Sequence, residues 1–303
     1  MTMGTKPVPA ILLTILVQGI GIAMWTWGSG QALRLHSTMY GFSGAWLGVM
    51  LIGVLGAVIV GLAGLASKLS PAGLLVVGVV HVVASVAFTL MPLTGSLRMN
   101  PLFDLAIAIR RLSASLSDGL VMLMATGTGM VLGAWMIGLG LSRGRSRAAG
   151  GGGSGVSVVL GVATAGLAIG TLLAGGWTYL QVFIYLSPNI ASVLVGLLCA
   201  VGLAICLAAM ANPRLGGLLA AAVLVVAGLS VASPAVLLGS GLPRPLVNGM
   251  LNTVASGGLL SCGIAVGVLC LTVRAAAPAK PWHPADASTN DWSPTGPTDQ
   301  TLR

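Results

Sequence analysis

Residues 51–65 read LIGVLGAVIVGLAGL, a run without one charged or strongly polar side chain. A helix that is apolar on every face is buried in a large core or lies in a membrane. Seven further stretches share this character, and the five acidic residues of the chain all lie outside the eight. About 20 predominantly apolar residues cross a bilayer core as a helix. The sequence therefore predicts an all-α fold, a polytopic transmembrane helical bundle of about eight spans.

The composition indicates the same fold class. Charged residues make up 6% of the chain, against about 25% in ordinary globular chains, and the mean hydropathy is +1.02. Strands of a membrane barrel would alternate apolar and polar residues over about ten positions, and these stretches do not. The expected spans are Pro9–Trp27, Ala45–Ala66, Ala72–Met91, Gly119–Leu141, Val156–Gly175, Ile190–Ala211, Leu215–Val231 and Leu251–Val273.

Basic residues in short loops predict which side of the membrane each loop faces. With the N-terminus inside, nine lysines and arginines fall on the cytoplasmic side and five on the outer side. The cluster of Arg143, Arg145 and Arg147 beside the fourth span carries most of this difference. We therefore expect both termini to be cytoplasmic, in a plasma membrane of the bacterial inner-membrane type.

The order of features in residues 1–141 recurs in residues 156–273. The fourth and eighth spans open with the similar motifs Asp118–Gly119–Leu120–Val121 and Asn248–Gly249–Met250–Leu251. The third and seventh spans begin with Gly73–Leu74–Leu75 and Gly217–Leu218–Leu219. An even number of spans in each copy gives both copies the same orientation, so we expect two parallel-related four-helix repeats.

Three segments outside the spans complete the expected domain organisation. Residues 142–155 form an Arg/Gly-rich cytoplasmic linker between the repeats, and residues 274–303 form a disordered cytoplasmic tail rich in proline, serine and threonine. In residues 100–117, Leu102, Leu105 and Ile109 recur at spacings of three and four. This spacing predicts an amphipathic helix that lies along the outer surface of the first repeat.

Aromatic residues gather near the predicted outer interface. A belt that anchors helices at headgroup level explains such residues, but a belt marks both interfaces and the inner one is almost bare. The second interpretation is an aromatic rim that receives a lipid, an apolar solute or a partner helix. The candidate rim residues are Trp25, Trp27, Trp46, Trp177 and Tyr179.

Polar residues inside the spans need partners within the bundle, because the bilayer core offers no water. His81 is the titratable side chain deepest in a span apart from the cysteines, and both a structural bond and a functional role stay open for it. If the protein has a solute path, we expect Gln18, Thr126, Thr128, Asn252 and Ser256 to line a cavity that opens toward Trp25, Trp27 and Trp177. The candidate interior polar residues are Gln18, His81, Thr126, Thr128, Asn252 and Ser256.

Gly41–Phe42–Ser43–Gly44, followed by Gly48, resembles the GxSG and GxxxG pattern of rhomboid intramembrane proteases. The resemblance implies a catalytic dyad of Ser43 with a histidine on a later span, here His81. His81 lies about ten residues, or about 15 Å, below the outer end of its span, whereas Ser43 lies at the outer edge. A nucleophile and its base must be within hydrogen-bond reach, so an intramembrane hydrolase ranks third among the interpretations.

The leading interpretation is a non-enzymatic, multi-pass transporter-like protein, or a subunit of a transport complex, for an apolar or lipid-like solute. The alternative is a membrane scaffold that binds a partner. The expected partners are the lipid bilayer and either a membrane protein or a second copy of the chain. Nucleic acid is not expected, since the net charge of +9 is scattered over membrane-flanking loops. The four cysteines form no metal-binding pattern, so no cofactor or metal is expected.

Overall fold

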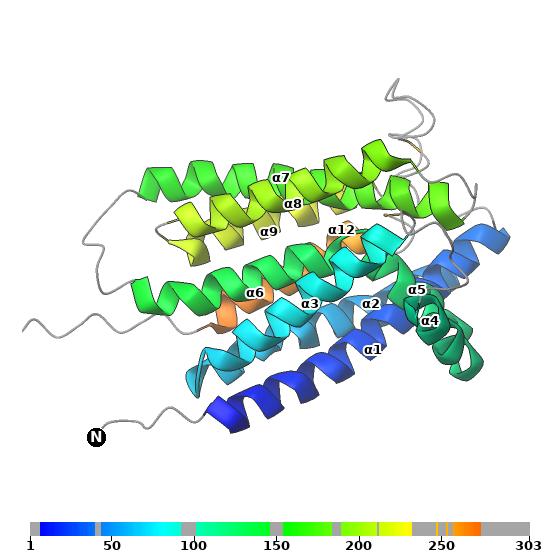
Figure 1. The fold of residues 1–303 in the computed structure, drawn as a ribbon, viewed down its shortest axis with the longest axis horizontal. Coiled ribbons are helices and arrows are strands. Elements are labelled where there is room, and N and C mark those ends of the chain that lie inside the picture. The colour runs from blue at the N-terminus through cyan, green and yellow to red at the C-terminus, as the bar shows by residue number, and fades with distance from the viewer. Residues whose placement is uncertain are drawn as a thin grey trace, which may run out of the picture.

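The computed structural model describes residues 7–39, 44–91, 101–145, 154–183, 189–210, 212–231, 247, 253 and 257–273. Helices account for nearly all of these residues (Figure 1). The elements are α1 (Pro7–Met39), α2 (Gly44–Leu62), the 3-10 helix η1 (Ala63–Lys68), α3 (Ala72–Leu90), α4 (Pro101–Leu112), α5 (Ala114–Ala125), α6 (Thr128–Arg145), α7 (Ser154–Phe183), α8 (Ile190–Ala209), α9 (Pro213–Val231) and α12 (Gly258–Thr272).

Six of the described helices are long and apolar enough to cross a membrane, which confirms the prediction of a multi-pass helical membrane protein. They are α1, α2 with η1, α3, α7, α8 and α9. The pair α5 and α6 adds a seventh span if the two are counted together, and α12 is a shorter apolar helix of 15 residues. The total of eight spans therefore stays a prediction.

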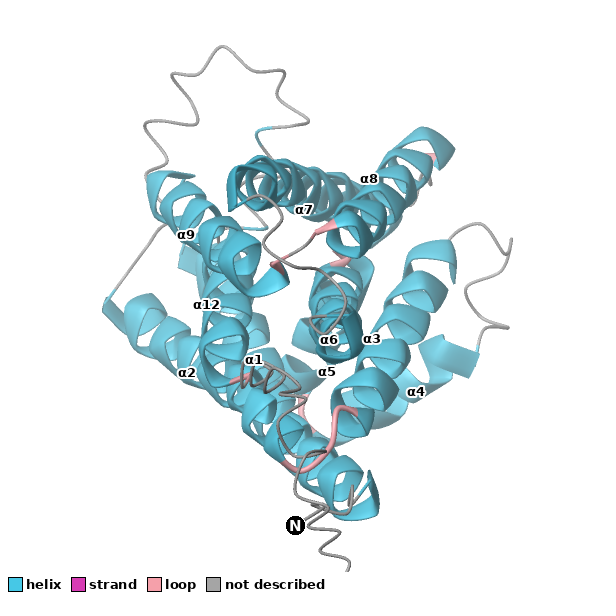
Figure 2. Ribbon diagram, turned by 90° about the vertical axis from the view of Figure 1, so that its left-hand side faces the viewer, coloured by secondary structure: helices cyan, strands magenta, loops and turns pink. Residues whose placement is uncertain are grey.

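The helices pack in two groups along the chain. In the first group α1 contacts α2, α3 and α5, while α3 contacts α6; in the second, α7 contacts α8 and α9, while α9 contacts α12. The groups meet where α12 contacts α2 and where α6 contacts α8. Figure 2 shows α6 near the middle of the bundle, and its side chains Trp135, Met136 and Leu139 are fully buried.

Glycines allow some of these helices to approach each other at backbone distance. A Cβ built on Gly28 of α1 would lie only 2.5 Å from the backbone nitrogen of Gly53 on α2. Any larger residue at Gly28 would force the two helices apart. This is the packing that small residues provide in lipid, where association depends on close contact between helices.

The predicted fourth span is broken in its apolar part. Helix α5 ends at Ala125 and α6 begins at Thr128, and the two helix axes differ by 63°. Gly127 between them has a φ of 79°, a conformation that glycine adopts without the steric cost borne by other residues. Gly257, directly before α12, has a φ of 69°. This second left-handed glycine follows Asn248 at the same interval at which Gly127 follows Asp118.

The amphipathic segment of residues 100–117 divides into two helices. Helix α4 covers Pro101–Leu112, and Ser113 then adopts an extended conformation and caps α5, its Oγ accepting a hydrogen bond from the Leu116 amide at 3.3 Å. Helix α4 lies at the end of the bundle opposite the N-terminus (Figure 1). We call this end the α4 end; it is the side that the sequence predicts to face outward.

Candidate functional site

Gln18 and His81 form a buried polar contact between helices. His81 Nε2 on α3 lies 3.2 Å from Gln18 Oε1 on α1, and Gln18 Nε2 donates a hydrogen bond of 2.9 Å to the Val60 carbonyl on α2. Both side chains are buried. One amide therefore connects three helices, and its two ends are satisfied by protein atoms.

Thr126 and Thr128 flank the break in the fourth span. Both are buried, and their hydroxyl oxygens lie 3.0 Å apart, within hydrogen-bond distance. Each of these two hydroxyls therefore has a polar partner beside the break. Asn252 and Ser256, the other two candidate interior polar residues, lie outside the described residues.

The candidate rim residues are distributed over several clusters. Trp25 is 1% exposed and belongs to the main core, while Trp46 packs with Ala32 and Met50 in a separate buried cluster. Tyr179 packs beside Phe88 at the α4 end. Trp27 and Trp177 are partly buried. The structure thus does not gather these five residues around the larger cavity described next.

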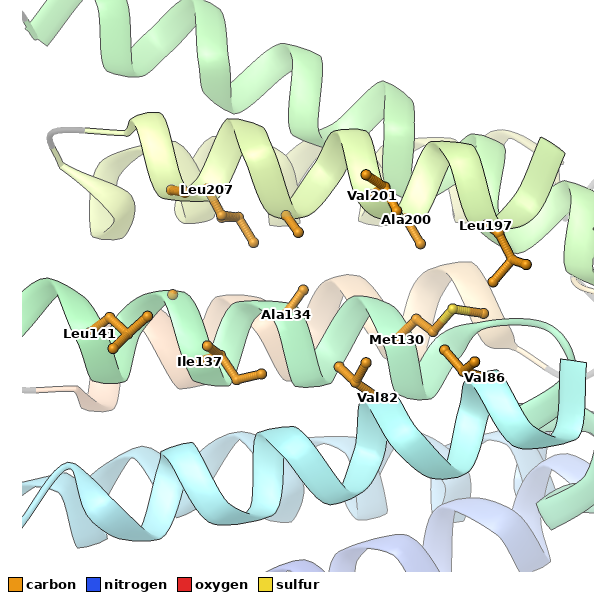
Figure 3. A pocket seen from close by; sticks show the side chains of 13 residues that line it. Val82, Val86, Met130, Ala134, Ile137, Leu141, Leu197, Ala200, Val201 and Leu207 are labelled. Carbon is orange, nitrogen blue, oxygen red and sulfur yellow. The ribbon is translucent and has the colours of Figure 1, made fainter. Parts of the chain in front are cut away.

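A cavity of about 270 Å³ lies between the two groups of helices, bounded by α3 and α6 on one side and α8 on the other. Figure 3 shows side chains from these three helices pointing into the space between their ribbons. Every lining residue is apolar or a glycine. The lining residues are Val82, Val86, Met130, Ala134, Ile137, Gly138, Leu141, Leu197, Ala200, Val201, Ala204, Leu207 and Ala208.

This cavity is a groove that opens sideways. Val201 and Leu141, two of its lining residues, are 56% and 48% exposed. Leu198 and Ile205, which lie on α8 near Val201, are also exposed large hydrophobic residues. The groove is therefore continuous with an apolar surface of the membrane-spanning helices, and we call it the apolar groove.

A smaller cavity of about 110 Å³ lies under α4 and contains both apolar and charged residues. Phe88 and Met91 line it together with Arg110, Asp118 and Tyr179. Asp118 also accepts a hydrogen bond of 2.8 Å from Arg34 on α1, so its carboxylate is held by an ion pair. Residues of α4 thus form one wall of this cavity.

The described residues assemble neither of two common catalytic devices. Among them, no three histidine, cysteine, aspartate or glutamate side chains are placed to hold a metal ion. His81 Nε2 contacts Gln18, and Ser43, the proposed nucleophile of the rhomboid-like pattern, lies outside the described residues. The feature that the described residues do form is an apolar groove.

The lining of the apolar groove was not predicted from the sequence. Its alanines, valines and leucines have the same chemistry as residues that face lipid or fill the core, and no polar residue marks their position.

A comparison of the chain with known protein families, curated proteins and solved structures finds no match.

Proposed function

We propose that the protein is a non-enzymatic, transporter-like membrane protein, or a subunit of a transport complex, that takes up a lipid-like solute in the apolar groove. The observation that carries this proposal is the groove itself, an apolar space between the two groups of helices. Ligand sites of bundles and transporters occur between helices and at the interface of repeated units.

An acyl chain is the solute chemistry that this groove fits. A ligand with buried polar groups would lose its hydrogen bonds there, at a cost of several kcal/mol, because the lining offers no side-chain donor or acceptor. Transfer from the surrounding lipid brings no hydrophobic gain, since lipid tails are as apolar as leucine. Binding would depend instead on the many dispersion contacts that a concave wall makes with a chain.

The proposal includes the two parallel-related repeats, and similar glycine contacts support them. Gly133 on α6 packs on α3 as Gly263 on α12 packs on α9. A Cβ built on Gly133 would lie 2.5 Å from the Gly78 carbonyl oxygen and 3.0 Å from the Val82 amide nitrogen, both on α3. A Cβ built on Gly263 would lie 3.0 Å from the Ala221 carbonyl oxygen and 2.9 Å from the Val225 amide nitrogen, both on α9. Gly78 and Ala221 are separated along the chain by the same number of residues as Val82 and Val225. We call this separation the α3–α9 interval.

A second pair of glycines relates α2 to α8 in the same way. A Cβ on Gly53 would lie 3.7 Å from the amide nitrogen of Ser29 and 3.8 Å from the carbonyl oxygen of Trp25 on α1. A Cβ on Gly196 would lie 4.0 Å from the corresponding atoms of Gly175 and Thr171 on α7. Gly53 and Gly196 are separated by the α3–α9 interval, which supports one common register for α2–α3 and α8–α9.

The same register changes which glycine of the seventh span is paired with Gly73 of the third span. A Cβ on Gly73 would lie 2.7 Å from the Ala10 carbonyl, and one on Gly216 would lie 3.1 Å from the Ser157 carbonyl. These contacts pair Gly73 with Gly216, whereas sequence identity pairs it with Gly217. The left-handed glycines Gly127 and Gly257 keep the offset that the sequence predicts for the fourth and eighth spans.

Photolabelling tests the proposed function. The protein is reconstituted in vesicles of phosphatidylcholine and phosphatidylglycerol with a palmitic acid that carries a diazirine, and labelled peptides are identified by mass spectrometry. We expect label on the groove-lining parts of α6 and α8. Ala204→Phe, which fills the groove, should reduce that label about tenfold, equivalent to about 1.4 kcal/mol.

Ala209→Phe is the matched control, because Ala209 is exposed on the same helix and does not line the groove. Label spread evenly over lipid-facing residues such as Leu198, and unchanged by Ala204→Phe, would contradict the proposal. Movement across the membrane is measured in the same vesicles with a fluorescent phosphatidylglycerol and an impermeant quencher. Binding without movement would favour a structural lipid site over transport.

One observation favours a second candidate function, a membrane scaffold. Gln18 and His81 bond helix to helix and do not line the apolar groove, which is what a scaffold requires of its interior polar residues. For a scaffold, the groove would seat a helix of another membrane protein. Cross-linking of Ala204→Cys to a co-purified protein, with no fatty-acid labelling, would support this alternative.

A further inference from the structure

The apolar groove has a counterpart elsewhere in the bundle. In the register described above, α8 corresponds to α2 and α6 corresponds to α12, so the contact of α8 with α6 corresponds to the contact of α2 with α12. We call these two contacts the α8 seam and the α2 seam. Ala200, Ala204 and Leu207 of the α8 seam correspond to Ala57, Gly61 and Gly64 of the α2 seam.

The α2 seam is closed by direct backbone contact. A Cβ on Gly61 would lie 2.7 Å from the Ala265 carbonyl, and one on Gly64 would lie 3.0 Å from the Leu269 carbonyl. Thr272 Oγ1 also lies 3.0 Å from the Gly61 carbonyl across this seam, within hydrogen-bond distance, and 2.8 Å from the Val268 carbonyl of its own helix. Ala57, Gly61 and Gly64 are all buried in this contact.

At two of these three positions the α8 seam carries the larger side chain, Ala204 in place of Gly61 and Leu207 in place of Gly64. Leu207 is buried and packs against α6, where a Cβ on Gly138 would lie 3.5 Å from Leu207 Cβ, an ordinary van der Waals distance. Ala204, at the position of Gly61, is exposed and lines the groove. The Ala204 Cβ and the Leu207 side chain therefore project from α8 at positions where Gly61 and Gly64 have no side chain. The α2 seam instead receives side chains from α12, since Cβ atoms built on Gly61 and Gly64 would first meet Val268 and Thr272.

We infer that Ala204 and Leu207 hold α8 away from α6, so that the groove is a fixed site for one acyl chain at one seam only. The two seams then do not exchange open and closed states, although the repeats share one architecture. Closing the α8 seam to the same separation would place the Leu207 side chain where, beside Gly64, the Thr272 hydroxyl lies in the other seam. Opening the α2 seam would lose the close contact of Gly61 with the Ala265 carbonyl and with Thr272. The identity of the ligand rests on the proposed function; the separation of the helices does not.

Distances between spin labels test the separation without any ligand. In a cysteine-free background, one pair of labels replaces Leu141 and Ile205, and a second pair replaces the corresponding Leu271 and Leu62. All four side chains are exposed. In detergent without added lipid, we expect a single distance for each pair, with the longer distance at the α8 seam. Two distances for either pair would show exchange and overturn the inference.

Variants then test the two residues. Ala204→Gly combined with Leu207→Gly should shorten the distance at the α8 seam and reduce fatty-acid labelling of the groove about tenfold. Leu207→Ala is the milder second variant and should shift the distance in the same direction. Gly166→Ala, where a built Cβ meets nothing within 4 Å, is the control and should change neither measurement.

The outcomes separate this inference from the proposed function. An unchanged distance in both Leu207 variants would overturn the inference even if the groove binds fatty acid. Wild-type labelling at the α2 seam as well as the α8 seam would also overturn it. Single wild-type distances that shorten in the variants, with no labelling at all, would support the fixed separation and reject the proposed ligand.

Discussion

Gln18 shows, at the scale of single residues, how a polar side chain is accommodated in a membrane bundle. A buried amide in lipid must bond within the protein, and Gln18 does so with His81 and with the Val60 carbonyl. The contact is reciprocal for His81, since its Nε2 would lose this partner if the amide were removed. The pair is therefore a unit in energetic terms.

A double-mutant cycle measures this unit. Gln18→Leu should lower the free energy of unfolding by about 1–2 kcal/mol, the range of interhelical hydrogen bonds in membranes. The combined Gln18→Leu and His81→Leu change should cost less than the sum of the single changes, because neither then leaves a buried partner unpaired. Thermal or detergent-induced unfolding provides the measurement. Changes that add within about 0.3–0.5 kcal/mol would show that the contact is not energetically coupled.

Residue chemistry explains which site residues the sequence predicts. Gln18, His81, Thr126 and Thr128 stand out because a polar residue in a span needs a partner, and all four are buried. Their partners do not stand out, since one of them is the Val60 carbonyl, which every residue type carries. Ala204 and Leu207 give no signal at all, because the neighbours of an apolar residue, and not its chemistry, decide whether it faces lipid, core or groove.

At the scale of elements, the break between α5 and α6 depends on the conformation of one residue. Hydropathy alone predicts a continuous span from Gly119 to Leu141, because Thr126, Gly127 and Thr128 interrupt the apolar run only slightly. The positive φ of Gly127 redirects the chain by 63° at this point. Hydropathy locates the apolar elements, but it does not reveal a local dihedral angle.

Gly127→Ala tests the need for this conformation. We expect it to lower stability by at least about 1–2 kcal/mol, because a Cβ is strained at positive φ. It would also approach the Thr171 side chain to 2.7 Å. Gly127→Asn should be less costly in backbone strain, since asparagine enters the left-handed region more readily. Gly166→Ala is the helical control, and a Gly127→Ala protein as stable as this control in thermal unfolding would contradict the account.

At the scale of the whole molecule, composition determines the class of the protein and packing determines its site. The apolar character of the spans is sufficient to predict a multi-pass helical bundle, because lipid admits few other ways to satisfy a backbone. The sidedness of the membrane, with both termini cytoplasmic, rests on the arginine distribution and stays a prediction. The position of the groove depends on how α6 and α8 meet, which the periodicity of either helix alone does not specify.

The similar contacts in the two groups make the difference between the two seams informative. Gly61 of α2 and Gly64 of η1 allow backbone contact with α12, whereas the corresponding Ala204 and Leu207 line the groove between α8 and α6. In the repeat arrangement that we propose, side-chain size at a few positions accounts for a groove at one of two corresponding contacts. The central claim is therefore an acyl-chain site at a defined location between the two groups of helices, where α8 meets α6.

An electron cryomicroscopy map of the protein in lipid nanodiscs tests this claim most directly. We expect an elongated density between α6 and α8, in contact with Ala134, Leu197 and Ala204, and no such density between α2 and α12. The density should be weakened or displaced in the Ala204→Phe protein. Closure of the space between α6 and α8 at Ala134, Leu197 and Ala204, or lipid density confined to the outer perimeter of the bundle, would contradict the account.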